Sequence, residues 1–170
     1  LAPAGVVGHG DHAEGDALPL RFQHRLDPRQ VDVALEGMDQ RRLQALGDDE
    51  VAGGNQSDIL SGGTGRNRLA GKGSADRFRF SKTRSHDVIV DFAAVDGDTI
   101  DLAGIFAGMS GLPSQYLKVV TMVTRGPDNK PRVDTRLELN YDGTGAVADQ
   151  TITLEGVSFG SSDLPRLIGE

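Results

Sequence analysis

The sequence predicts an all-β fold: a short parallel β-roll continued by a C-terminal β-sandwich-like or hairpin region, preceded by a disordered N-terminus and a short helix. Three observations support this prediction. A nine-residue period runs through residues 53–80, later segments alternate apolar and polar residues, and 23 glycines accompany only 5% aromatic residues. We therefore expect an N-terminal extension (1–49), a repeat region (50–80) and a C-terminal β region (81–170).

The repeat region holds three nine-residue blocks in fixed phase. Each block has a glycine first, an acidic or amide residue sixth and an apolar residue eighth. The three sets are Gly53, Gly62 and Gly71; Asp58, Asn67 and Asp76; and Leu60, Leu69 and Phe78. The first six positions form turns, because glycine reaches positive φ at low cost. The last three form a minimal strand with one buried side chain. Turn and strand in alternation coil into a parallel β-roll.

Two of the sixth-position residues, Asp58 and Asp76, lie two blocks apart, which is 76 − 58 = 18 residues. Since two blocks make one full coil, we expect their side chains on the same edge of the roll, about 4.8 Å apart along the stack. Two carboxylates at that spacing repel each other unless a cation lies between them. An oxygen-only site beside turn carbonyls suits calcium.

Two other interpretations of the repeat stay open at this point. One is a glycine-rich surface loop with an incidental period, although three coincident phases argue against it. The other is a calcium-free roll in which nearby arginines offset the carboxylates. Those arginines are Arg66, Arg68, Arg77 and Arg79.

Composition narrows the function further. The net charge of −7 and the pI near 5.0 argue against nucleic acid as a partner. There are no cysteines, so stability must come from something other than disulfides, and metal binding is one such route. No apolar run is long enough for a membrane span, and no signal-peptide pattern is seen. The chain begins at Leu1, which is compatible with a fragment of a longer protein.

The segments that flank the repeats are assigned from their spacing. Asp27 and Pro28 are typical of a helix start, and Gly47 would end that helix, which would cap the first coil. Its apolar residues are Val31, Leu35, Met38, Leu43 and Leu46. Residues 2–15 show no periodicity and are expected to be disordered. Strands are expected at residues 18–22, 86–92, 99–102, 117–123, 136–141 and 151–154, with a helical turn within residues 102–109.

The pattern Gly-Gly-x-Gly-x-Asp-x-apolar-x resembles the RTX nonapeptide, a calcium-binding repeat. The resemblance implies that aspartates and backbone carbonyls of two same-edge turns bind one calcium ion. Those ligands are Gly54, Gln56, Asp58, Gly71, Gly73 and Asp76. Gln56, Lys72 and Ser74 replace glycines of the pattern. Asn67 would anchor a site on the other edge with an oxygen but no charge, so we expect one or two calcium ions rather than a long ladder.

Four aspartates that follow the repeats allow two interpretations. They are Asp87, Asp91, Asp98 and Asp101. By the same resemblance, Asp91 and Asp98 in particular would add ligands to a late site in a coil that continues with degenerate turns. The alternative is that these are strand-end and turn carboxylates that face water.

Residues 52–170 carry a second resemblance, to the C-terminal target domain of proteins exported by type I secretion, especially RTX adhesins. The shared features are an Asp-x-Ile-x-Asp-Phe-type strand, a Gly-Asp-x-Ile-Asp-Leu strand, a long hairpin, and a closing strand with a leucine-containing tail. The resemblance implies an uncleaved export signal that a type I transporter reads while the chain is unfolded. It also implies a secreted or cell-surface protein of a Gram-negative bacterium.

Three functions are considered on this basis. The first is a non-catalytic module that folds on extracellular calcium and carries the secretion signal. The second is the tail of a secreted RTX metalloprotease, lipase or alginate epimerase whose chemistry lies upstream, because the chain has no His-Glu-x-x-His, Gly-x-Ser-x-Gly or cysteine nucleophile. The third is an adhesin module that binds polysaccharide or a cell surface, although the chain offers no Trp and two Tyr.

Overall fold

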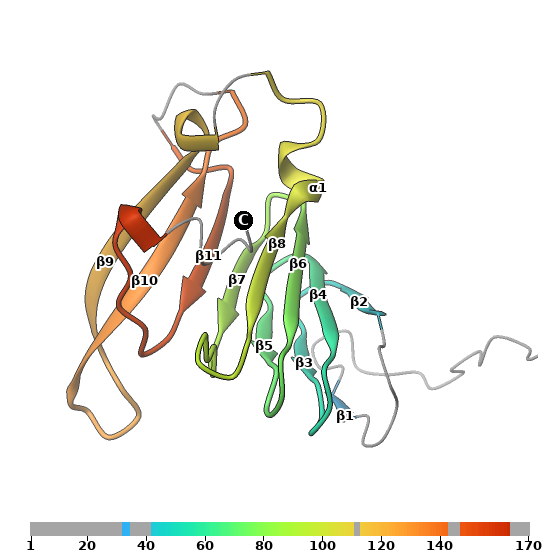
Figure 1. Ribbon diagram of the computed structural model, residues 1–170, viewed down its shortest axis with the longest axis vertical. Coiled ribbons are helices and arrows are strands. Elements are labelled where there is room, and N and C mark those ends of the chain that lie inside the picture. Colours follow the sequence, from blue (N-terminus) through green and yellow to red (C-terminus); the bar gives the residue numbers. More distant parts are fainter. Residues whose placement is uncertain (1–31, 35–41, 111–112, 143–146, 164–170) are drawn as a thin grey trace, which may run out of the picture.

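The computed structural model describes residues 32–34, 42–110, 113–142 and 147–163. This part is mostly β and forms two sheets with a shared apolar core (Figure 1). Across sheet A the order is β1 (Asp32–Ala34), β3 (Glu50–Ala52), β5 (Arg68–Ala70), β7 (His86–Ile89), β11 (Gln150–Leu154), β10 (Pro131–Leu139) and β9 (Leu117–Arg125). Across sheet B it is β2 (Arg42–Leu46), β4 (Ile59–Thr64), β6 (Arg77–Ser81) and β8 (Thr99–Leu102).

From β3 to β8 the chain passes alternately from sheet A to sheet B, and each strand pairs in parallel with the strand one coil earlier. In sheet A, Arg68 lies opposite Glu50 on one side and Val88 on the other. In sheet B, Phe78 lies opposite Leu60 and Ile100. This parallel coil is what the nine-residue period predicts, and it continues beyond the repeats through β7 and β8.

The inside of the coil is filled by apolar residues of every strand from β3 to β8, with Phe80 and Leu102 as second contributions from β6 and β8. Sheet A contributes Val51, Leu69 and Ile89, and sheet B contributes Leu60, Phe78 and Ile100. Each is at most 3% exposed. The eighth position of the repeat therefore supplies the core, because the neighbouring side chains of a strand point to the opposite face.

The C-terminal strands extend sheet A. Strand β11 pairs in parallel with β7, and β10 and β9 follow as an antiparallel hairpin. Figure 1 shows these three strands beyond the end of sheet B. The inner face of this extension buries Leu117, Leu137, Leu139, Ile152 and Leu154. The hairpin part of the expected C-terminal region is confirmed, whereas the sandwich-like part is not, because the strands join an existing sheet.

Short helical turns connect the strands. The helix α1 (Ala103–Phe106) follows β8 directly, as expected, and its Ile105 is buried in the core. Two 3-10 turns, η1 (Pro113–Gln115) and η2 (Ser161–Asp163), lie before β9 and after β11. None of the helices in the described ranges is long and apolar enough to cross a membrane.

The helix expected around residues 31–46 is wrong where the structure describes it. Residues 32–34 and 42–46 are the strands β1 and β2, which pair in parallel with β3 and β4. The register sets Leu43 beside Leu60, so pairing with the coil outweighs an approximate helical spacing. The expected helix start at Asp27, the strand at residues 18–22 and the disordered N-terminus lie outside the described residues.

The coil core gives a stability prediction. Leu69→Ala removes a fully buried side chain at the centre of β5 and should lower the free energy of unfolding by about 2–5 kcal/mol in urea denaturation. Val123→Ala is the control, because Val123 is 75% exposed and its truncation should change that energy by less than about 0.5 kcal/mol. Equal effects of the two changes would contradict the assigned core.

Candidate metal centre

The turns of the coil lie on two edges. Turns 53–58, 71–76 and 90–98 lead from sheet A to sheet B and end on Asp58, Asp76 and Asp98, which we call the aspartate edge. On the return edge, Asp49, Asn67 and Asp87 each precede or begin a strand of sheet A, and we call this the asparagine edge.

Hydrogen bonds join two carboxylates of the aspartate edge to the backbone of the preceding coil, while the third, Asp58, accepts the Gly54 N–H of its own turn at 2.7 Å. The Asp58 N–H donates to Asp76 Oδ1 at 2.8 Å, and the Asp76 N–H donates to Asp98 Oδ1 at 2.9 Å. All three side chains are buried. Asp58 and Asp76 therefore lie on the same edge one coil apart, as their 18-residue spacing predicts.

Glycine lets the backbone approach these carboxylates. A Cβ on Gly53 would lie 2.6 Å from Asp58 Oδ2 and 2.7 Å from the Gly71 carbonyl oxygen, both too close for a real side chain. A Cβ on Gly71 would likewise overlap the Asp76 carboxylate. A carboxylate oxygen and a carbonyl oxygen thus converge on one small space that only a glycine at position 53 leaves open.

The departures from the repeat pattern leave the third turn intact. Lys72 and Ser74 adopt φ values of 75° and 74°. The second repeat block has positive φ at the equivalent positions, where its residues are Gly63 and Gly65. A non-glycine residue in this region is strained by about 1–2 kcal/mol. Asp91 offsets part of this strain, since its two carboxylate oxygens accept the N–H groups of Gly71 and Lys72 at 3.0 and 2.9 Å. Asp91 is thereby placed on the aspartate edge.

The aspartate edge is unfavourable for negative charge. The pKa of Asp76 is raised from 3.8 to about 7. Burial is the largest cause and the charges of Asp98, Asp58 and Asp91 act in the same direction, whereas the hydrogen bond from the Asp58 backbone lowers the pKa. Burial also raises the pKa of Asp98. A carboxylate in this position is stabilised either by a proton or by a cation.

The arginines of the repeats do not supply that cation. Arg68 pairs with Glu155 at 3.3 Å and Arg79 pairs with Asp101 at 2.9 Å. Within the described ranges, no lysine or arginine forms an ion pair with Asp58, Asp76 or Asp98. The interpretation of the repeats as an arginine-compensated roll is therefore not supported by the ion pairs.

The donor set of the aspartate edge fits a hard cation. No three histidine or acidic side chains of the described residues converge closely enough to hold a metal by themselves, so a site here would need backbone carbonyls as well. Two contacts join the implied ligands of the two turns. The Asp58 N–H donates to Asp76 Oδ1, and the Gly73 N–H donates to the Gly54 carbonyl at 3.1 Å. Gln56 lies in the same turn as Gly54, and its side chain is exposed. Only oxygen atoms are offered, which is the donor set calcium prefers.

The asparagine edge is built differently. Asn67 Oδ1 accepts the Asp49 N–H at 3.2 Å, and Asn67 Nδ2 donates to Asp87 Oδ1 at 2.6 Å. The Ser85 hydroxyl donates to Asp87 Oδ2 at 2.6 Å and accepts from Gln150 Nε2 at 2.9 Å. Burial raises the pKa of Asp87, while the hydrogen bonds from Ser85 and Asn67 act in the opposite direction. Asn67, one of the expected metal ligands, is thus engaged with side chains and backbone.

Sequence reasoning missed Asp49, Ser85 and Gln150. A signal existed for Asp49, because Asp49 and Val51 lie nine residues before Asp58 and Leu60 and so continue the period upstream. The block lacks the first glycine of the pattern, since Gln44 stands there. No local signal marks Gln150, which is 65 residues from Ser85.

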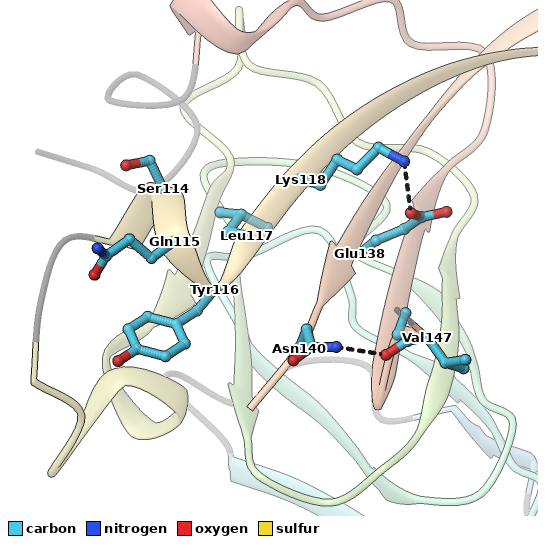
Figure 2. Close-up of a pocket in the computed structure, with 9 residues that line it drawn as sticks. Ser114, Gln115, Tyr116, Leu117, Lys118, Glu138, Asn140 and Val147 are labelled. Carbon is cyan, nitrogen blue, oxygen red and sulfur yellow. Dashed lines mark hydrogen bonds and ion pairs between the residues drawn. The ribbon is translucent and has the colours of Figure 1, made fainter. Parts of the chain in front are cut away.

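Two surface hollows lie away from the aspartate edge. Figure 2 shows one at the start of β9, where Lys118 pairs with Glu138 at 3.4 Å and Asn140 Nδ2 donates to the Val147 carbonyl at 2.7 Å. Its volume of about 80 Å³ is below the roughly 300–1,000 Å³ of ordinary ligand pockets. The other, of about 310 Å³, lies on the outer face of sheet A across β5, β7 and β11.

Comparisons with known proteins give one solved structure of interest. No protein-family model matches the chain, and no curated protein matches it. The chain is similar to the solution structure of the AlgE6R3 subunit of the mannuronan C5-epimerase from Azotobacter vinelandii, with 26% identity and a TM-score of 0.47. The match covers 75% of this chain and 70% of that one. At this TM-score the likeness does not by itself establish a shared fold.

The raised pKa of Asp76 gives a pH prediction for the protein in excess EDTA. Because the folded-state pKa of about 7 exceeds the ordinary 3.8, protonation favours the folded state, and this stability is lost as pH rises through about 7. The melting temperature should therefore fall between pH 5 and pH 8. Asp76→Asn keeps a carbonyl acceptor without the titrating group and should flatten this profile. A wild-type melting temperature that rises over this range would contradict the assignment.

Proposed function

We propose that this protein is a non-catalytic calcium-binding module of RTX type, which folds when it meets extracellular calcium. The observation that carries the proposal is the buried stack of Asp58, Asp76 and Asp98, whose charges have no basic partner among the described residues. When bound, calcium would supply the positive charge that this stack lacks. Asp58 and Asp76 would hold it together with the carbonyls of Gly54, Gln56, Gly71 and Gly73.

The chain's own residues explain why folding would depend on the cation. Without it, the carboxylates repel one another, and the glycine-rich turns lose much conformational entropy when they order. Metal binding to a site that exists only in the folded chain adds its free energy to folding. Extracellular calcium modules bind at about 10⁻⁴–10⁻³ M, and a free concentration ~100 times the dissociation constant stabilises the folded state by about 2.7 kcal/mol.

The proposal extends to export. A chain that stays unfolded at cytosolic calcium concentrations can be threaded through a type I transporter, and it folds outside where calcium is abundant. In this proposal the C-terminal end of the chain carries the export signal, and the protein acts outside a Gram-negative cell or on its surface. Any catalytic chemistry would belong to an upstream domain of the same polypeptide.

The carboxylate stack gives a calcium prediction. In excess EDTA the β signal in circular dichroism should be weaker and should melt at a lower temperature than in calcium, and it should rise on addition of calcium but not of equimolar magnesium. Asp76→Ala should weaken this response more than Asp87→Ala, because both Asp87 oxygens are already bound by side-chain donors. A spectrum that is insensitive to calcium and EDTA would remove the proposed function, and equal effects of the two variants would refute the site.

A second candidate function is binding of an acidic polysaccharide, favoured by the larger hollow on sheet A. Arg66, Arg68 and His86 line it and are exposed, although the chain as a whole carries a net charge of −7. Thr151 and Thr153 add hydroxyl groups to the same face. This arrangement offers cationic and hydrogen-bonding groups to the carboxylates and hydroxyls of a uronate chain.

Reversal of one charge tests this second function. Arg66→Glu should weaken retardation of the folded protein in gels that contain polyuronate by several-fold, whereas Lys130→Glu, on the far β9–β10 turn, should leave it unchanged. Equal retardation of the two variants would exclude the hollow as the binding site.

A further inference from the structure

We infer that the step between Asn67 and Asp87 on the asparagine edge closes without metal, and that Asn67 is the residue that excludes calcium from this step. This inference rests on the proposed calcium-dependent folding and specifies which edge of the coil binds calcium. It follows from a comparison of the sixth position of the repeat on the two edges. This position is Asn67 on the asparagine edge, and Asp58 and Asp76 on the aspartate edge.

The first step concerns the orientation of the Asn67 amide. Its oxygen accepts from the Asp49 backbone N–H, and its nitrogen donates to the Asp87 carboxylate at 2.6 Å. The reverse orientation would set two donors against each other at Asp49 and two acceptors against each other at Asp87. The two neighbours therefore fix the amide, and its N–H₂ group points at the carboxylate, where it prevents a cation from bridging the two side chains.

The second step concerns Asp87, which is 1% exposed. One of its oxygens accepts from Asn67 and the other from the Ser85 hydroxyl, at 2.6 Å in each case. Hydrogen bonds to a charged acceptor are short and strong. A buried carboxylate needs hydrogen-bond donors or a counter-ion beside it, and at Asp87 side-chain donors occupy the positions next to both oxygens, where a cation would otherwise lie.

The third step is the continuation of these bonds into the C-terminal strands. Gln150 of β11 donates to the Ser85 hydroxyl at 2.9 Å and accepts from the Tyr141 hydroxyl. Gln150 and Ser85 are both fully buried. A chain of side-chain hydrogen bonds thus runs from Asn67 to Tyr141. It joins the coil to the C-terminal strands of sheet A.

Among the residues that the structure describes, the aspartate edge has no such chain of side-chain hydrogen bonds. At the equivalent steps its carboxylates accept only backbone N–H groups, from Gly54, Asp58, Asp76 and Ala93. Successive like charges therefore face one another there without an amide between them. On the asparagine edge, Asp49 Oδ2 is buried without a hydrogen-bond partner among the described residues, so the satisfied step is the one between Asn67 and Asp87. At that step the residue type at the sixth position, amide or acid, decides whether the next carboxylate faces a hydrogen-bond donor or another carboxylate.

Calcium stoichiometry tests the inference. By isothermal titration calorimetry on the full chain, Asn67→Ala should bind as many calcium ions as the wild type, whereas Asp76→Asn should bind at least one fewer. Asn67→Asp should be less stable than the wild type in EDTA, should regain stability with calcium, and should bind at least one ion more. Loss of an ion in Asn67→Ala, or no gain in Asn67→Asp, would overturn the inference.

A second measurement does not depend on whether the variants fold. In the calcium-loaded wild type, the side-chain amide protons of Asn67 should be protected from solvent exchange in nuclear magnetic resonance spectra, because the amide nitrogen remains bonded to Asp87 and to the Thr64 carbonyl. Rapid exchange of these protons would overturn the inference. A wild type that neither folds on calcium nor binds it would instead remove the proposed function and leave the metal-free closure of this step in place.

Discussion

The coil depends on one constraint: the aspartates that end the second and third turns, Asp76 and Asp98, each accept a backbone N–H from the coil before. This bond ties turn 53–58 to turn 71–76 and turn 71–76 to turn 90–98. It also forces acidic side chains into a buried column, where water cannot solvate them. The interaction that aligns the coils is therefore the one that accumulates charge, and the two edges resolve this conflict in different ways.

Much of the coil could be predicted from the sequence, because its period is local. Nine-residue spacing alone places Asp58 with Asp76 and fills the core with Leu60, Leu69 and Phe78. The third turn was expected despite Lys72 and Ser74, and it forms with both residues at positive φ. Spacing fails where the block degenerates, as at Gln44, and the strands β1 and β2 were mistaken for a helix.

The asparagine edge could not be predicted in the same way. A substitution of Asn for Asp in the pattern reads as a weakened metal ligand, since both residues offer an oxygen. The structure gives the amide nitrogen a partner that the spacing does not reveal, because Asp87 lies 20 residues away instead of 18. The parallel pairing of Thr151 with His86 is likewise set by tertiary contacts and carries no short-range signal.

The antiparallel hairpin has a consequence for how such a coil can grow. At one end, strand β11 is followed by β10 and β9, which run as a hairpin and so break the alternation between the two sheets. At the other end, β1 and β2 retain the parallel direction of the coil. Elongation of the solenoid past β7 is therefore closed off in sheet A, because β11 takes the position of the next coil and an antiparallel hairpin follows it.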